Sequence, residues 1–293
     1  MAALTLIRLL LRCTRILPPA LAWRLGAGLG DAFGALPMRD QGRARTHLAI
    51  AFPAADPTWI KRTARACFRH TGAMALWTLA TLGREPRALR RGIVVEGAEH
   101  IRALVRASRA GQGTFVYTGH FGNWELLART FATISPSSVI ARRMRSPLID
   151  ALIQGTRAEG GAEVLYQDGD AREVLRRLRQ GRTVATLADQ DIPALAGVFV
   201  PWFGHEAYTP SGPAALATLA RCPVHAMFLY WNRKAGRWVL HCGPRWQPAR
   251  SGDRAADIRS LTALATSYQE ALVRRSPEQW VWWHKRWRTR PNP

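Results

Sequence analysis

Residues 114–127 read TFVYTGHFGNWELL, a strand-like run that passes through a short turn into a helix-like run. Residues 114–118 are β-branched or aromatic, which predicts a buried strand. Asn123 favours the N-cap position, so a helix is predicted to begin directly after it. A strand followed closely by a helix is the repeating unit of parallel α/β sheets.

The same alternation continues on both sides of this stretch. Strands are predicted at 93–95, 138–141, 162–166 and 183–188, and helices at 98–109, 147–159 and 171–180. Residues 224–231 and 238–242 flank a short turn, which predicts a hairpin, and residues 254–275 predict a long amphipathic helix. The predicted fold class is therefore α/β, with a mostly parallel central sheet flanked by helices.

The composition is that of a globular protein with anionic partners. Of 293 residues 47% are hydrophobic, which allows a large core and excludes the disordered and collagen-like classes. The formal charge is +22, and Arg supplies most of it; its planar guanidinium suits phosphate and carboxylate. This charge favours nucleic acid, anionic lipid or an acidic carrier protein as partner.

The four cysteines are predicted to be reduced and mostly buried. They form no CxxC pair and have no His at zinc-ligand spacing, so neither a redox motif nor a zinc site is indicated.

His120 and Glu125 are the predicted catalytic pair. His120 directly follows a strand, where reactive groups of α/β sheets gather, and it can act as a general base near neutral pH. Glu125 falls in the first turn of the next helix, where a carboxylate is stabilised and can orient the imidazole. The spacing alone is weak, but the flanking glycines at a strand–helix junction strengthen it.

Several further blocks share a pattern with one known family. They are Glu96–His100, His120–Glu125, Asp189–Asp191, Gly197–Gly204 and Pro277–Trp287. From about residue 43 to residue 291 the chain resembles the bacterial lipid A biosynthesis late acyltransferases, of the lauroyl or myristoyl type. Trp202 stands where that family more often has Phe.

The resemblance implies an O-acyltransferase at the cytoplasmic face of the bacterial inner membrane. The implied donor is an acyl-acyl carrier protein, and the implied acceptor is a hydroxyl of a lipid A precursor. The family's catalytic motif corresponds to His120 and Glu125. Arg157 corresponds to a family Arg linked to activity, and Asp189 to the acid that opens the central block. No cofactor and no metal are expected.

Arg157 and Asp189 each have more than one interpretation. Arg157 fits an oxyanion-stabilising group, a ligand for substrate phosphate, or a solvated arginine at a helix end. Asp189 is assigned, with Arg157, to substrate or oxyanion binding. It ends an apolar strand, so it lies at the same edge as His120 if the strands are parallel; the alternative is a helix or turn cap. No Ser or Cys nucleophile stands beside His120, which favours direct transfer without an acyl-enzyme.

Residues 1–38 are predicted to be a membrane anchor, followed by the catalytic domain at 39–293. Arg8, Arg12 and Arg15 share one helical face beside an apolar one, as in helices at anionic membranes. Neither apolar stretch offers about twenty uncharged residues, so the anchor is either interfacial or spans once. The alternative is an ordinary amphipathic helix packed on the domain.

The tryptophan-rich end, residues 280–287, predicts a mixture of buried Trp side chains and basic side chains near substrate or membrane.

Two other functions stay open: a same-family enzyme that acylates another lipid, such as a glycolipid or ornithine lipid, and a basic nucleic-acid-binding protein. The apolar amino terminus and the lack of a binding module argue against nucleic acid.

Overall fold

The structure, a computed structural model, describes residues 14–144 and 146–291. Contacts along the chain group it into two units. The first combines Met1–Glu85 with Val273–His284, and the second combines Pro86–Leu272 with Lys285–Pro293. Arg8 and Arg12, two members of the predicted basic face of the anchor, lie outside the described residues.

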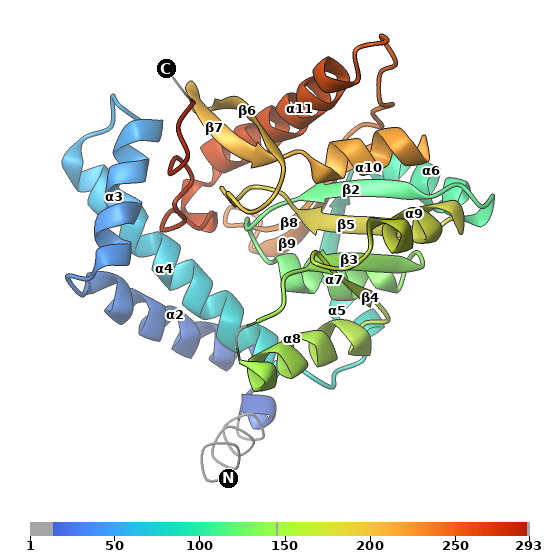
Figure 1. Cartoon of the computed structure of the whole chain (residues 1–293). Coiled ribbons are helices and arrows are strands. Elements are labelled where there is room, and N and C mark those ends of the chain that lie inside the picture. The colour runs from blue at the N-terminus through green and yellow to red at the C-terminus, as the bar shows by residue number, and fades with distance from the viewer. Residues whose placement is uncertain (1–13, 145, 292–293) are drawn as a thin grey trace. The chain divides into compact units, whose positions relative to one another are not determined.

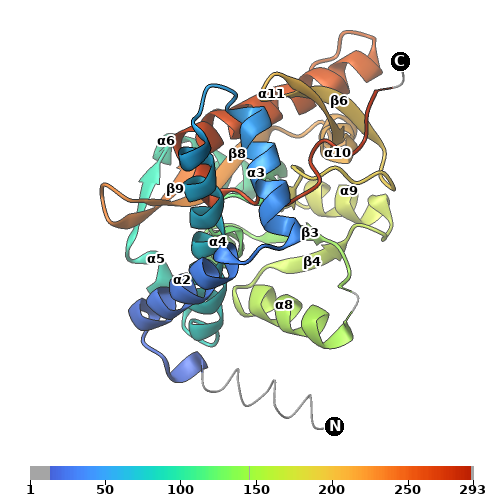
Figure 2. The same cartoon turned by 90° about the vertical axis from the view of Figure 1, so that its left-hand side faces the viewer.

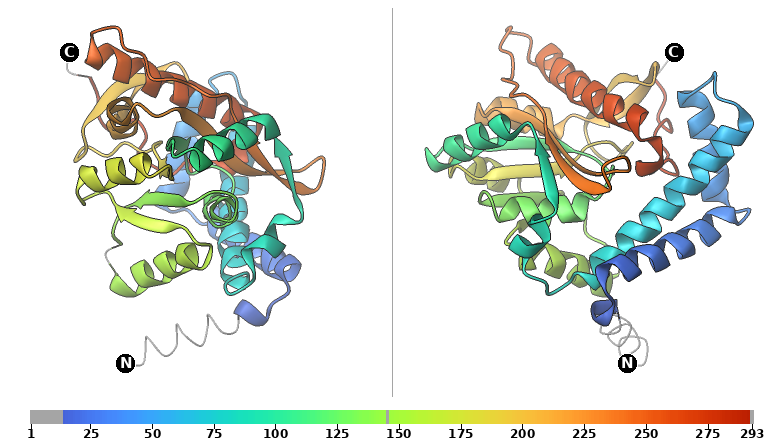
Figure 3. Two further views of the ribbon diagram at one scale, coloured as in Figure 1. Left: turned by 90° about the vertical axis from the view of Figure 1, so that its right-hand side faces the viewer. Right: turned by 180° about the vertical axis from the view of Figure 1, so that it is seen from behind.

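The first unit is helical, with helices α2 (Pro19–Ala35), α3 (Arg39–Ala51) and α4 (Pro57–Ala80). α2 and α4 run side by side, as Figure 3 shows in blue and cyan. A Cβ atom on Gly30 would lie 2.2 Å from the carbonyl oxygen of Phe68, and one on Gly26 would lie 2.3 Å from that of Gly72. The two helices therefore approach so closely that α2 requires glycine at both positions.

The opposite side of α2 is apolar and exposed. Its exposed side chains recur every four residues, and they are Leu21, Leu25, Leu29 and Phe33. Such spacing lines up one face of a helix. Among residues 14–144 and 146–291, no helix combines the length and apolar character needed to cross a bilayer.

Tryptophans from the end of the chain fill the core of the first unit. Trp280 and Trp282 are fully buried, which confirms the prediction that several Trp side chains are interior. The Nδ1 atom of His47 lies 2.9 Å from the Trp282 carbonyl oxygen, and the Cys67 thiol donates to the Trp280 carbonyl oxygen over 2.6 Å. Burial lowers the pKa of His47 and raises that of Cys67 to about 12.

The second unit is built on a seven-stranded sheet with the order β1-β9-β8-β2-β5-β3-β4 (Figure 1). Its strands are β1 (Ile93–Glu96), β2 (Thr114–Thr118), β3 (Ser137–Ala141), β4 (Glu163–Tyr166), β5 (Thr183–Leu187), β8 (Val224–Asn232) and β9 (Arg237–Cys242). The five strands from β8 to β4 are mutually parallel, and β9 pairs antiparallel with β8. The predicted mostly parallel sheet and the predicted hairpin are therefore confirmed.

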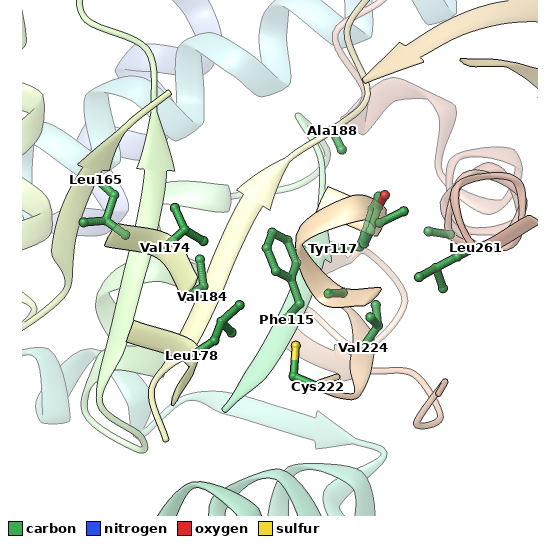
Figure 4. Packing of buried hydrophobic residues seen from close by; sticks show 13 residues of the cluster. Phe115, Tyr117, Leu165, Val174, Leu178, Val184, Ala188, Cys222, Val224 and Leu261 are labelled. Atoms are coloured by element: carbon green, nitrogen blue, oxygen red, sulfur yellow. The ribbon is translucent and has the colours of Figure 1, made fainter. Parts of the chain in front are cut away.

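Helices cover this sheet. They are α5 (Pro86–Arg90), α6 (Ala98–Arg109), α7 (Trp124–Ala132), α8 (Pro147–Glu159), α9 (Ala171–Arg179), α10 (Gly212–Ala220) and α11 (Arg254–Arg275). On one face, Phe115 and Tyr117 of β2 pack among residues of α9, α10 and α11, such as Leu178 and Leu261, around Val184 (Figure 4). α7 contacts β3 and β8, and it also contacts α8, which lies beside β4 (Figure 2).

A second, two-stranded sheet pairs β6 (Gly197–Trp202) with β7 (His205–Pro210) in antiparallel fashion. Phe203 and Gly204 form the turn, and both have positive φ angles, 53° and 79°. The Phe203 N–H donates to Glu270 over 2.6 Å, which holds this uncommon backbone conformation in place. Neither this hairpin nor α10 is predicted as an element by the sequence patterns.

Candidate active site

The turn between β2 and α7 is shaped by glycine and capped by Asn123. Gly122 has φ of 65°, and a Cβ atom there would lie 2.0 Å from the Leu229 carbonyl oxygen. The same carbonyl accepts the Asn123 N–H over 2.7 Å, which fixes the turn on β8. The Asn123 side chain accepts the Leu126 N–H over 2.9 Å, so it is the predicted N-cap of α7. His120 is thereby held at the carboxyl end of β2.

Asp189 orients the imidazole of His120. β2 and β5 are parallel neighbours, so their carboxyl ends lie together, as expected if Asp189 and His120 share an edge. One Asp189 oxygen lies 2.8 Å from Nδ1 of His120, and the other accepts the His120 backbone N–H over 2.7 Å. Asp189 is 3% exposed, so its carboxylate acts on the ring with little competition from water.

The Gln190 side chain also contacts the imidazole, close to both of its nitrogens. Its side-chain nitrogen is 3.0 Å from Nε2 of His120 and 3.2 Å from Nδ1. With Nδ1 donating to Asp189, Nε2 carries the lone pair and accepts from this amide. The basic nitrogen therefore faces away from Asp189. Sequence motifs gave no sign of this contact, although Gln190 follows Asp189 directly.

Glu125 pairs with Arg157 in this structure. Nε and Nη2 of Arg157 donate to the two Glu125 oxygens over 3.0 and 2.7 Å. The Glu125 side chain is 16% exposed and that of Arg157 is 12% exposed, so this bidentate pair is largely shielded from water. The two predicted acids thus have different partners, since Asp189 contacts His120 and Glu125 contacts Arg157.

A cavity of about 200 Å³ connects these groups. His120, Glu125, Arg157 and Gln190 line its outer part, and it reaches Phe131 at the end of α7 and Ser137 at the start of β3. It therefore runs along the sheet beneath α7 from the carboxyl towards the amino ends of the strands.

The inner wall of the cavity is mostly apolar. Val116, Ala185 and Val139 stand in register on β2, β5 and β3, and all three line it. Ala128 of α7 also lines it, and Ala128 and Ala185 are only partly buried despite their positions within the fold. Two small residues therefore leave the space open. An apolar recess beside a histidine side chain suits a hydrocarbon chain.

Thr118 adds a hydroxyl that sequence reasoning missed. It lines the cavity two positions before His120, is 5% exposed, and its Oγ1 has no hydrogen-bond partner among the described residues. A buried hydroxyl without a partner costs free energy, which a ligand that accepts its hydrogen bond would offset.

A buried cation, Arg286, feels the charges of Asp189 and Asp191. Arg286 is fully buried and donates to the Tyr208 carbonyl oxygen and to the Thr209 hydroxyl, each over 2.7 Å. Burial lowers the pKa of Arg286 to about 10, and the charges of Asp189 and Asp191 act in the opposite direction. The tail prediction placed basic side chains near substrate or membrane, whereas Arg286 is interior because it balances this acidic pair.

The three described cysteines, Cys67, Cys222 and Cys242, are free and buried, as predicted. Within the described part of the chain, no group of three or more His, Cys, Asp or Glu side chains converges as metal ligands would.

Comparison with known proteins gives a consistent result. The sequence profile of the bacterial lipid A biosynthesis acyltransferases matches residues 2–289. The chain is 27% identical over 277 residues to the lipid A biosynthesis lauroyltransferase of Escherichia coli K12, covering 94% of this chain and 88% of that protein. It is 25% identical over 274 residues to the lipid A biosynthesis acyltransferase of Haemophilus influenzae Rd, covering 91% and 81%. The lipid A biosynthesis palmitoleoyltransferase of Escherichia coli K12 is 22% identical over 268 residues, covering 91% and 85%.

Proposed function

The chain belongs to the bacterial lipid A biosynthesis acyltransferases, and we propose that it transfers a fatty acyl chain from a thioester donor to a hydroxyl of a lipid A precursor. As predicted, it is an O-acyltransferase. The observation that carries the proposal is the His120 imidazole, held by Asp189 at the opening of a largely apolar cavity.

His120 is the general base of the proposed reaction. The acceptor hydroxyl takes the place of the Gln190 amide at Nε2 and gives its proton to that nitrogen. Its oxygen attacks the thioester carbonyl carbon, a C–O bond forms, and the carbonyl electron pair moves onto oxygen. When the C–S bond breaks, the departing thiolate takes the proton from Nε2. Asp189 stabilises the imidazolium that exists between these two transfers.

Arg157 is the proposed stabiliser of the negative charge on the carbonyl oxygen. Glu125 occupies Nε and Nη2, and Nη1 has no hydrogen bond among the described residues. Since Arg157 lines the cavity, Nη1 is the group that can donate to the oxyanion. Glu125 then acts in catalysis by fixing the guanidinium plane, and the Thr118 hydroxyl is a second donor from the same wall.

The donor is proposed to be an acyl-acyl carrier protein, whose acyl chain enters the cavity. The formal charge of +22 supports an acidic protein partner. Attraction between exposed charges is screened over about 10 Å at 0.1 M salt. The rate with the carrier-protein thioester should therefore fall steeply with added salt. A coenzyme A thioester that is the better donor at every salt concentration would exclude the carrier protein.

The proposed location is the cytoplasmic face of the inner membrane, with residues 1–38 as its anchor. The exposed stripe Leu21, Leu25, Leu29 and Phe33 on α2 supports an interfacial mode of attachment. Arg24 on the same helix is exposed and suits an anionic leaflet.

Mass spectrometry of lipid A from cells with and without the protein tests the function. A lipid A short of one acyl chain in its absence is the expected result. The purified His120→Ala variant should lose about 10²–10⁴-fold in rate, whereas His205→Ala, at an exposed position on the β6–β7 hairpin, should not. Unchanged lipid A together with loss of an acylated glycolipid or ornithine lipid would move the proposal to that acceptor.

A further inference from the structure

We infer that Gln269 is a positioning residue for the base, because it fixes the Asp189 carboxylate that orients His120. The inference rests on the transfer function proposed above and adds a residue that no sequence motif marks. Gln269 lies on α11, a helix that supplies no side chain to the cavity wall. It therefore acts through Asp189 and does not touch the reacting atoms.

The contacts form one connected network. The Gln269 side-chain nitrogen donates to Oδ2 of Asp189 over 2.9 Å. The same oxygen accepts the His120 backbone N–H over 2.7 Å, and Oδ1 faces Nδ1 of the imidazole at 2.8 Å. With Oδ2 held from two directions, the carboxylate plane cannot turn without breaking a buried hydrogen bond.

Gly119 shows how tightly this network is packed. A Cβ atom on Gly119 would lie 2.1 Å from the Gln269 side-chain nitrogen and 2.6 Å from Oδ2 of Asp189. Only glycine leaves room for the amide at this point of the chain. The glycine before His120 is therefore explained by Gln269 and Asp189.

The position of Gln269 on α11 argues against a packing role. Leu261 and Ala265 precede it at four-residue spacing on the buried face, and Gln269 is itself 5% exposed. An apolar residue would satisfy packing there, and a buried amide costs free energy unless it is hydrogen-bonded. The amide is thus matched to Asp189 and not to the apolar surroundings.

Gln269 and Arg286 have complementary effects on Asp189. Arg286 acts on the carboxylate through its charge, since its hydrogen bonds go to the neutral Tyr208 carbonyl and Thr209 hydroxyl. A distant charge stabilises the ionised form of a carboxylate but does not fix its orientation. The orientation of the Asp189 carboxylate is fixed instead by the hydrogen bonds from the Gln269 amide and the His120 backbone N–H.

Replacing Gln269 with leucine tests the inference in the full-length protein. Gln269→Leu keeps the volume and removes the donor, so kcat should fall, by up to about a hundredfold, while KM for both substrates stays unchanged. Thr266→Val, on the same buried face of α11, is the matched control and should keep the kcat of the wild type. Equal kcat in the two variants would overturn the inference.

A double substitution shows whether Gln269 acts through Asp189. In an Asp189→Ala background, Gln269→Leu should cause no further loss of kcat, because the two residues act as a unit. Independent, multiplicative losses would contradict the inference.

Hydrogen exchange provides a readout that needs no substrate. Gln269→Leu should speed exchange of the His120 amide, which donates to Asp189, and leave the Ala188 amide, which donates to Thr118, unchanged. If the wild type transfers no acyl chain and this exchange still changes, the network stands and the proposed function fails. Unchanged exchange at His120 in an active enzyme would refute the role of Gln269.

Discussion

Both carboxylate oxygens of Glu125 accept hydrogen bonds from Arg157, one from Nε and one from Nη2. This bidentate geometry fixes the plane of the guanidinium as well as its distance. The pair lies on the cavity wall together with His120. Glu125 therefore sets the direction in which the remaining nitrogen of Arg157 presents its protons.

The first prediction follows from the planarity of Arg157. Arg157→Lys keeps the charge but cannot make two parallel hydrogen bonds to Glu125, so the cation loses its fixed direction. We expect kcat to fall about 10²–10³-fold, as when an oxyanion donor is removed. Arg172→Lys, at an exposed position on α9, is the control and should be fully active. Steady-state kinetics measures kcat for both variants. If Arg157→Lys has the same kcat as Arg172→Lys, Arg157 does not stabilise the oxyanion.

The second prediction concerns the length of the acyl chain. Ala185 and Ala128 line the middle of the cavity and leave it open. Ala185→Leu should fill that space and shift the preferred donor towards shorter chains, because each methylene buried contributes about 0.8 kcal/mol, or about fourfold in affinity. Phe131→Ala, at the inner end, should shift the preference towards longer chains. Competition among donors of graded length measures both shifts.

The control for these substitutions is Ala132→Leu. Ala132 lies on α7, as Ala128 and Phe131 do, but it does not line the cavity. Its chain-length profile should match that of the wild type. If Ala185→Leu lowers the rate equally for every donor length, the cavity does not hold the acyl chain.

The sequence predicts that Asp189 lies at the same sheet edge as His120, because both residues follow strands, whereas it predicts the orienting contact with the imidazole for Glu125. Parallel neighbouring strands end at one edge, so topology alone brings the two residues together. The partner of Glu125 does not follow from the sequence in the same way. A side chain in the first turn of a helix can turn towards several neighbours, and the position of Arg157 on α8 decides among them.

Neither the Gln269–Asp189 contact nor the β6–β7 hairpin can be predicted from the sequence, for different reasons. Gln269 acts across 80 positions of sequence, and a single Gln on an amphipathic helix carries no local signal. The hairpin turns at Phe203 and Gly204, where Asn-Gly or Asp-Gly would be the usual sign of positive φ angles. The Glu270 contact that holds Phe203 is again distant in sequence.

The third prediction concerns acid stability. Burial lowers the pKa of His47 and of His225, whose Nδ1 atom lies 3.0 Å from the Gly243 carbonyl oxygen. The unfolded chain takes up protons at these sites near pH 6.5 while the folded chain does not. Lowering the pH through about 6.5 therefore favours unfolding, and the free energy of unfolding should fall.

Asparagine substitution tests the contribution of each histidine to this pH dependence. In His47→Asn and His225→Asn the amide nitrogen takes the place of Nδ1 but does not titrate. Denaturant unfolding between about pH 5 and pH 7.5 should show a smaller pH slope for both variants than for the wild type. His205→Asn, at an exposed position, should keep the wild-type slope. Equal slopes in all four proteins would show that neither buried histidine contributes.

The last prediction concerns the exposed stripe on α2. Leu29 is 69% exposed and shares its face with Leu25, while the opposite face packs on α4 through Gly26 and Gly30. Substituting Leu25→Asp and Leu29→Asp therefore changes the exposed face and leaves the glycine contacts with α4 intact. A buried leucine contributes about 1.5–3 kcal/mol, so each substitution should weaken binding to anionic lipid vesicles about tenfold or more. Activity towards a detergent-dispersed acceptor should remain, because the catalytic groups are untouched.

Leu219→Asp is the matched control for this stripe, since Leu219 is an exposed leucine on α10. Vesicle sedimentation should show the wild-type amount of bound protein for this variant and much less for Leu25→Asp and Leu29→Asp. High salt alone should release only part of the wild-type protein, because apolar contacts persist when charges are screened. Complete release of the wild type by salt, or full binding of both α2 variants, would mean that the stripe does not enter the membrane and that attachment is electrostatic.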